Sequence, residues 1–279
     1  MSKISEFFTI STLSKQQDWK TILEKQNCIY LNKKCIKNRK SQAEISIGTC
    51  TVKYGKSETE VIICPHRLLE NHKIFLDCIH LLTLHEPGND LHIVSEVYIP
   101  GGSIDYFLVS ARDGKVKDFV GIEIQTMDTT GTVWPERQRF LEEKQVEYGI
   151  IENKTFGMNW KMTAKTILIQ LHHKIQTFEN LNKHLVLVVQ DCLLSYMQKE
   201  FSFSHISPNT KLGDSMHFHS YQLKHKEDNS YLLSLFERYS TDAAGIAKCL
   251  GLLAEANVGL EAILNTLESK ISDLTLLKL

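Results

Sequence analysis

Apolar and polar residues alternate along several short stretches of the chain, which is the pattern of a β-strand with one buried face. Residues 184–191 are instead almost continuously apolar and predict a strand that is buried on both faces. Residues 159–181 carry apolar side chains at helical spacing and predict the longest helix of the middle of the chain. The alternating stretches that we interpret as strands are 103–110, 116–125 and 216–224.

The last part of the chain, from about residue 231, has a helical pattern. Thr241 or Asp242 is placed to cap a helix, and Asn257 and Gly259 are placed to end it. The stretch "LEAILNTLESKI" predicts a second helix. The small residues favour close helix packing, and a helix-turn-helix that reads DNA is the alternative. Strands and helices together predict a mixed α/β fold.

The chain is expected to form three consecutive segments. Residues 1–70 look irregular, with only short alternating runs, and residues 71–230 hold the predicted strands and the long helix of a core. Residues 231–279 would supply C-terminal helices that pack on this core. A composition of 42% apolar and 23% charged residues is that of a globular protein, and no Gly-, Ser- or Pro-rich linker interrupts it.

Candidate targeting signals and the net charge indicate where the protein is located and which partners it could bind. No apolar run reaches the roughly 18 residues that span a bilayer, and the first residues lack the features of a signal peptide. We therefore expect a soluble, cytoplasmic protein. The formal net charge of -1 gives no global indication of a nucleic-acid partner. Between Glu24 and Glu44, however, every charged residue is basic, Arg39 and Lys40 included, so this run is either a solvated turn or a phosphate-contacting surface.

Two predicted strands flank the turn signal "RDGK" and form a hairpin. If the turn comprises the three residues 113–115, Asp105 lies directly across from Glu123. Gln125 shares their face because strand side chains alternate with period two. Glu96, on a predicted helix that leads into the Gly101–Gly102 turn, could add a third carboxylate. A one-residue slip in register would separate these groups, and an ordinary solvated polar face is the alternative.

Two facing carboxylates repel each other unless a cation lies between them. Oxygen-only ligands suit Mg²⁺, which can stabilise charge on a phosphate and activate a water molecule near neutral pH. Gln125 cannot act as a base, but its amide can orient that water. The hairpin therefore predicts a magnesium-dependent hydrolytic site.

The seven cysteines divide into two groups. Cys28, Cys35, Cys50 and Cys64 are separated by 6, 14 and 13 residues, without a CxxC motif, and are either metal ligands or ordinary buried thiols. A tetrahedron of four thiolates would stabilise a small irregular lobe, and all-sulfur ligation fits iron or zinc. The other three cysteines lie in apolar settings typical of core residues, namely Cys78, Cys192 and Cys249.

An acid after a Gly-rich turn, followed by Glu-x-Gln on the next strand, resembles the core of the PD-(D/E)XK nucleases. The longer words "GGSIDYFLV", "DFVGIEIQTMDTTG", "NWKMTAKTILIQLHHKI" and "LNKHLVLVVQD" resemble the NotI-type restriction endonucleases, as does "CIKNRKS…IGTC…IICPHRLLE". The resemblance implies that Asp105 and Glu123 bind Mg²⁺, with Gln125 where most relatives place Lys and Glu96 as a further active-site acid. It also implies one structural iron or zinc per chain on the four cysteines.

The resemblance further implies a type II restriction endonuclease of the bacterial cytoplasm, which hydrolyses both DNA strands at a GC-rich palindrome. A palindrome calls for two-fold related active sites and hence a homodimer, with a cognate DNA methyltransferase in the same system. Expected DNA contacts are Arg39, Lys40, Arg137 and Arg139, although the last two could simply belong to a polar loop that opens a helix at Pro135. The alternatives are a structure-specific repair or recombination nuclease, a non-cleaving DNA-binding protein and a structural thiol-metal protein.

Overall fold

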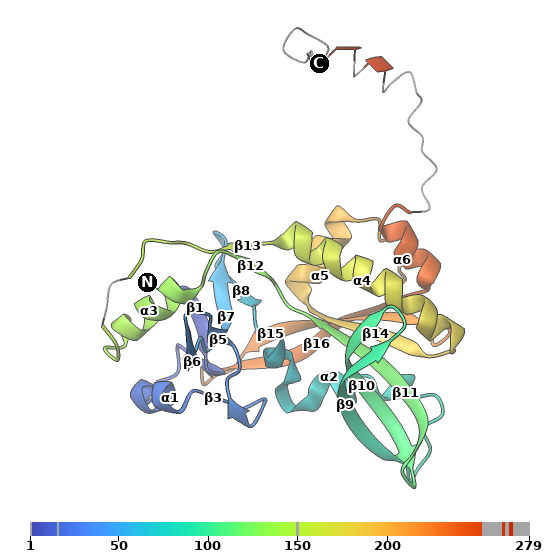
Figure 1. Cartoon of the computed structure of the whole chain (residues 1–279), viewed down its shortest axis with the longest axis horizontal. Helices are drawn as coiled ribbons and strands as arrows, with labels where there is room; N and C mark the ends of the chain where they lie inside the picture. Colours follow the sequence, from blue (N-terminus) through green and yellow to red (C-terminus); the bar gives the residue numbers. More distant parts are fainter. Residues whose placement is uncertain (1, 16, 149–150, 253–263, 266–267, 270–279) are drawn as a thin grey trace.

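The computed structural model describes residues 2–15, 17–148, 151–252, 264–265 and 268–269 (Figure 1). A six-stranded mixed sheet forms the larger part of it. Three central strands run parallel to one another, and the outer strands pair antiparallel. From one edge to the other the strands are β16 (Tyr231–Thr241), β15 (Met216–His225), β14 (His184–Gln190), β11 (Lys115–Gln125), β10 (Gly102–Arg112) and β9 (Asp90–Ile99).

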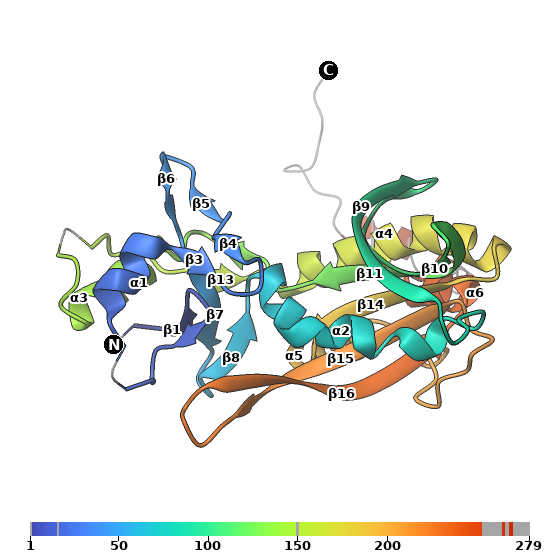
Figure 2. The ribbon, with the colours of Figure 1, turned by 90° about the horizontal axis from the view of Figure 1, so that it is seen from below.

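Helices cover both faces of this sheet, so the central strands are buried on two sides (Figures 1 and 2). All seven residues of β14 are buried, as its continuous apolar run predicts. The helix predicted over 159–181 is confirmed as α4. One face is covered by α4 (Trp160–Asn180), α5 (Asp191–Glu200) and α6 (Ala243–Cys249), and the other by the 3₁₀ helix η1 (Pro65–His72), α2 (Lys73–Leu76) and the 3₁₀ helix η2 (Ile79–Leu81).

The N-terminal segment carries a sheet of its own, although its sequence looked irregular. Helix α3 (Trp134–Glu143) packs on strand β1 (Ile4–Phe7) of this sheet, where Phe7, Trp19 and Phe140 form a small aromatic cluster. The sheet order is β2 (Ile10–Ser11), β1 (Ile4–Phe7), β7 (Thr49–Tyr54) and β8 (Thr59–Ile62), and the helices are α1 (Trp19–Lys25) and α3 (Trp134–Glu143). Short two-stranded pairs are β3 (Asn27–Cys28) with β4 (Lys33–Lys34), β5 (Asn38–Arg39) with β6 (Gln42–Ser46), and β12 (Thr129–Thr130) with β13 (Gly157–Met158).

A buried ion network joins this N-terminal sheet to the larger one. Arg67 is fully buried, and its guanidinium lies 2.8 Å from a carboxylate oxygen of Glu6 on β1 and 2.8 Å from one of Glu70. Glu70 in turn accepts a hydrogen bond of 2.7 Å from the backbone amide of Leu233 on β16. Because one guanidinium pairs with both carboxylates, each buried charge has a partner of opposite sign, and the network links the two sheets.

The C-terminal part differs from its sequence prediction. Residues 231–241, expected to be helical, form the edge strand β16, because their apolar residues pair along β15. Asp242 does cap α6, accepting a hydrogen bond of 2.8 Å from the amide of Gly245, but the helix ends at Cys249. Asn257, Gly259 and most of the second predicted helix lie outside the described residues. Among the helices described, none is long and apolar enough to cross a membrane.

Candidate active site

The hairpin of β10 and β11 has the predicted register, although its turn differs from the prediction. Tyr106 faces Ile122, and the pairing continues in step as far as Ser110 opposite Asp118. The turn itself has two residues, Asp113 and Gly114, both with positive φ, rather than three. A register shift just beyond Ser110 offsets the shorter turn. The two differences cancel, so the register at the acidic end is the one that the sequence predicted.

Asp105 and Glu123 are brought together at the end of this ladder. Oδ2 of Asp105 accepts a hydrogen bond of 2.8 Å from the backbone amide of Ile124. Glu123 is 4% exposed and, together with Asp105 and Gln125, lines a polar cavity of about 430 Å³ beside α4. Ile122 packs in the core on the opposite face, because side chains alternate along a strand.

Lys174 of α4 is a member of this site that the sequence did not single out from its neighbours. It is 6% exposed, and its Nζ lies 2.7 Å from Oε1 of Glu123. The signal was present, because Lys174 falls on the buried stripe of the helix, three residues after Leu171 and seven after Ile167. A lysine inside such a stripe requires an acidic partner.

The electrostatics of the cavity favour a cation. Burial raises the pKa of Glu123 to about 7, with a further increase from Asp105, while the hydrogen bond from Lys174 opposes this. Burial also raises the pKa of Asp105, against the hydrogen bond from the Ile124 amide and the charge of Lys174. One ammonium group thus faces two partly desolvated carboxyl groups. A divalent ion would favour the ionised form of both acids.

Glu96 lies on strand β9 and not on a helix, which corrects the sequence prediction. β9 is a largely exposed edge strand, so its sequence lacks the alternation that marks a half-buried strand. Glu96 has a positive φ of 55° and falls level with Asp105 in the pairing of β9 with β10. Its charge contributes to the raised pKa of Asp105. The Glu96 side chain lines a second cavity, shared with Asp105 and with Lys33 and His66 of the N-terminal segment.

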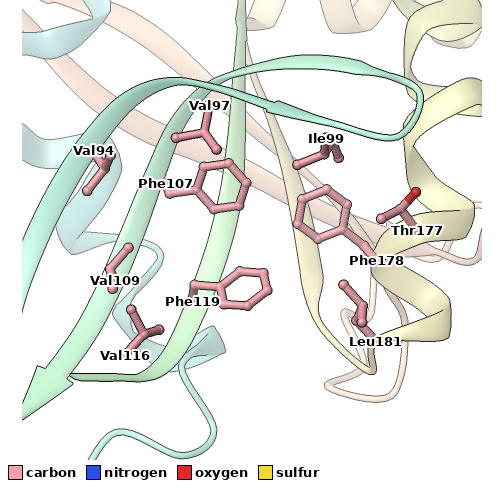
Figure 3. Close-up of a pocket in the computed structure, with 10 residues that line it drawn as sticks. All are labelled: Val94, Val97, Ile99, Phe107, Val109, Val116, Phe119, Thr177, Phe178 and Leu181. Carbon is pink, nitrogen blue, oxygen red and sulfur yellow. The ribbon is translucent and has the colours of Figure 1, made fainter.

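A third cavity has the opposite character. It lies between the curled strands β9 to β11 and the C-terminal end of α4, and Figure 3 shows Val97, Phe107, Phe119 and Phe178 converging on it. Its lining is apolar apart from the hydroxyl of Thr177. Because no ionisable group lines it, this cavity cannot hold a metal ion or a phosphate. The polar cavity that Asp105, Glu123 and Gln125 all line is the candidate active site.

The four cysteines of the N-terminal segment lie in one neighbourhood. A thiol–thiol hydrogen bond joins Cys50 to Cys64 and lowers the pKa of Cys64 to about 6, and Cys64 also interacts electrostatically with Cys28 and Cys35. Four clustered thiols are chemically suited to a tetrahedral iron or zinc ion. In the part of the chain that the structure describes, however, no three His, Cys, Asp or Glu side chains converge closely enough to hold a metal ion. Among the described residues, neither the four cysteines nor the acids of the polar cavity form such a group.

The basic residues singled out in the sequence divide between surface and interior. The Arg39 guanidinium lies 4.1 Å from the centre of the Trp134 ring, and both line a cavity of about 660 Å³ with Lys40. Arg137 is instead 1% exposed, pairs with Glu147 at 3.3 Å and also lies over the Trp134 ring. Arg139 forms an ion pair with Glu136 on the same helix. The predicted helix start at Pro135 is confirmed by α3.

The stretch "HFH" of β15 contributes two histidines, His217 and His219, and both are buried. His217 and His219 lie on the face of β15 that η2 covers. The ring of His80 stacks on that of His219, and the ring of His184 lies against that of His217. The imidazoles of His217 and His219 therefore belong to the core rather than to an exposed binding surface.

Comparison with known proteins identifies the family of the chain. A search of curated proteins finds no match. The family model described as restriction endonuclease NotI matches residues 24–228, which is more than two thirds of the chain. The matched range contains Asp105, Glu123 and Gln125 and all four clustered cysteines. The chain therefore belongs to the NotI restriction endonuclease family.

Proposed function

We propose that the protein is a type II restriction endonuclease that hydrolyses both strands of double-stranded DNA in a Mg²⁺-dependent reaction, with the PD-(D/E)XK arrangement of active-site residues. The observation that carries the proposal is the position of Asp105 beside Glu123 on one face of the hairpin, in a polar cavity. Membership of the NotI restriction endonuclease family makes the protein a nuclease. The acids supply the chemistry that this class of reaction needs.

Asp105 and Glu123 would hold Mg²⁺, with Glu96 close enough to add negative charge from the neighbouring strand. When bound, the ion stabilises negative charge on the phosphate and favours ionisation of water. Gln125, on the same face, orients the attacking water. The water releases a proton to solvent as its oxygen forms a new bond to phosphorus, a bridging P–O bond breaks, and the released oxygen of the sugar takes up a proton from solvent.

DNA would approach along the surface that holds Arg39 and Lys40. Stacking on Trp134 fixes the plane of the Arg39 guanidinium, which suits bidentate contact with a guanine edge or a phosphate. Lys40 is exposed and contributes an unspecific phosphate contact. Arg137, buried beneath Trp134, supports this surface from inside, and Arg139 flanks it.

The clustered cysteines would hold one structural iron or zinc ion per chain. A closed metal site would make the loop with Arg39 rigid, which lowers the entropy cost of binding DNA. We further propose a homodimer that acts on a GC-rich palindrome, protected in the host by a cognate methyltransferase.

Digestion of one fully sequenced phage genome tests the proposal. Incubation with Mg²⁺ is expected to give discrete fragments whose ends map to one palindromic sequence, and EDTA should prevent cutting. A smear, or cutting at branched junctions alone, would favour a structure-specific repair nuclease. A gel shift on DNA without any cutting would favour the alternative of a non-cleaving DNA-binding protein.

A further inference from the structure

We infer that Lys174 is a catalytic residue whose ammonium group, presented from helix α4, contacts the scissile phosphate. The inference rests on the proposed nuclease function. It concerns a residue on a different element from the two acids. The starting observation is that Lys174 Nζ lies 2.7 Å from Glu123 Oε1 inside the polar cavity.

The backbone around Lys174 is built to accommodate its side chain. A Cβ on Gly102 would lie 3.1 Å from Cε of Lys174, and a Cβ on Gly101 would lie 2.3 Å from the carbonyl oxygen of His173. Both glycines also have positive φ. The Thr177 hydroxyl donates a hydrogen bond of 3.1 Å to the carbonyl of Pro100, which holds the helix against this turn. The ammonium group is therefore held in position before any substrate arrives.

The opposite wall of the cavity lacks a cation of its own. Gln125 lies on the strand of Glu123, two residues further on, and its amide nitrogen donates to the carbonyl of Thr126 at 2.6 Å. Lys174 is the one basic side chain among the residues that line this part of the described structure. A phosphate that enters the cavity would gain its fixed positive charge from Lys174.

Three roles of Lys174 predict different measurements. A lysine that only neutralises Glu123 competes with a divalent ion, so its removal would strengthen metal binding without slowing cleavage. A lysine that only holds Glu123 in place would, on removal, weaken metal binding and cleavage together. A lysine that acts on the phosphate would, on removal, slow cleavage while metal binding stays the same or strengthens. Lys174 is expected to follow the third pattern.

The experiment compares Lys174→Met with Lys165→Met, an exposed lysine on the same helix that serves as the matched control. Mn²⁺ affinity is measured by calorimetry without DNA, and cleavage is measured as a single-turnover rate on plasmid DNA. Lys174→Met is expected to slow cleavage by roughly hundredfold with Mn²⁺ affinity at least equal to that of the unaltered protein. Lys165→Met should change neither quantity.

The conservative variant Lys174→Arg guards against a simple folding defect, because it keeps a cation on the same helix position. Its rate is expected to exceed that of Lys174→Met by at least about tenfold, since fixed charge at this place is what the reaction requires. An unchanged rate in Lys174→Met, a parallel loss of Mn²⁺ affinity, or no such recovery in a folded Lys174→Arg protein would each overturn the role of Lys174. Failure of the unaltered protein to cut DNA would instead refute the proposed function, and this inference with it.

Discussion

The backbone amide of Ile124 donates a hydrogen bond of 2.8 Å to the carboxylate of Asp105, and this bond fixes the acid of one strand against the neighbouring strand. It forms where the regular pairing of β10 with β11 ends, one position beyond Tyr106 opposite Ile122. The Asp105 carboxylate thus accepts a hydrogen bond from β11 at the point where the backbone pairing of the two strands has ended. This keeps Asp105 beside Glu123 without a bound ion.

Replacement of either acid should remove cleavage but not DNA binding. We expect Asp105→Asn and Glu123→Gln each to lower the single-turnover rate by roughly hundredfold or more, because a divalent ion loses a charged ligand. Binding to DNA, measured by gel shift in Ca²⁺, should stay within about threefold. Asp113→Asn, the same change at the turn of the same hairpin, is the control. Normal cutting by either acid variant would exclude these residues as metal ligands.

Arg39 should contribute to DNA affinity through its contact with Trp134. Arg39→Ala is expected to weaken binding about tenfold or more, the range for loss of one good bidentate contact. Lys20→Ala, an exposed change on α1, serves as the control and should leave affinity unchanged. Titration of a fluorescent palindromic duplex measures both. Equal DNA affinities of the two variants would show that the Arg39 surface is not part of the DNA interface.

The cysteine cluster should determine the metal content of the protein. Elemental analysis of purified protein is expected to give about one iron or zinc per chain, and Cys50→Ser together with Cys64→Ser should abolish it. Cys192→Ser, a half-buried thiol on α5, should leave the metal content unchanged. The doubly substituted protein should also melt at a lower temperature, because metal binding contributes to folding. A metal-free native protein would show that the thiols are ordinary core residues.

Acid should destabilise the protein through its buried histidines. Burial lowers the pKa of His217 to about 4, with smaller contributions from His184, His80 and Arg238, whereas the unfolded chain takes up the proton near the ordinary value of 6.5. The stabilisation is complete above about pH 6.5 and is lost as the pH falls towards 4. Its contribution to the free energy of unfolding should decrease by about 2 kcal/mol between about pH 7.5 and pH 5.

Urea unfolding at the two pH values measures this decrease. Glu123 acts in the opposite direction, since its raised pKa of about 7 favours the folded state as the pH falls from there. The comparison is therefore made between the unaltered protein and His217→Gln, which should show a smaller loss on acidification. His173→Gln, at an exposed position of α4, should behave like the unaltered protein. Identical pH dependence in His217→Gln would contradict the assignment.

The acidic hairpin could be predicted from the sequence because its two strands are neighbours in the chain and their alternating pattern lies within a short stretch. Alternation placed Glu123 and Gln125 on one face, and the core on the other face fixed the register despite the wrong turn length. Glu96 could not be placed in the same way, because an exposed edge strand with one residue at positive φ carries no alternating pattern. Its position depends on pairing with β10, which is a tertiary property.

Two other features depended on packing between distant segments. Residues 231–241 carry apolar side chains at spacings that also suit a helix. They form a strand because they pair with β15. Arg137 looked like a surface residue in a basic loop, but its helix packs on the N-terminal sheet, so its guanidinium is buried. In both cases a partner far away in the sequence determined the environment.

The ion network of Arg67 sets a practical limit on how far the chain can be shortened. Glu6 lies before residue 24, where the match to the NotI family begins, yet its carboxylate is a direct partner of a fully buried guanidinium. A truncated protein that starts at residue 24 would leave Arg67 with a single acidic neighbour in the interior, Glu70. Loss of one partner of a buried ion pair costs on the order of 3–5 kcal/mol, a large share of the stability of a typical domain. Expression trials designed from the family boundary alone would therefore discard a residue on which the fold depends.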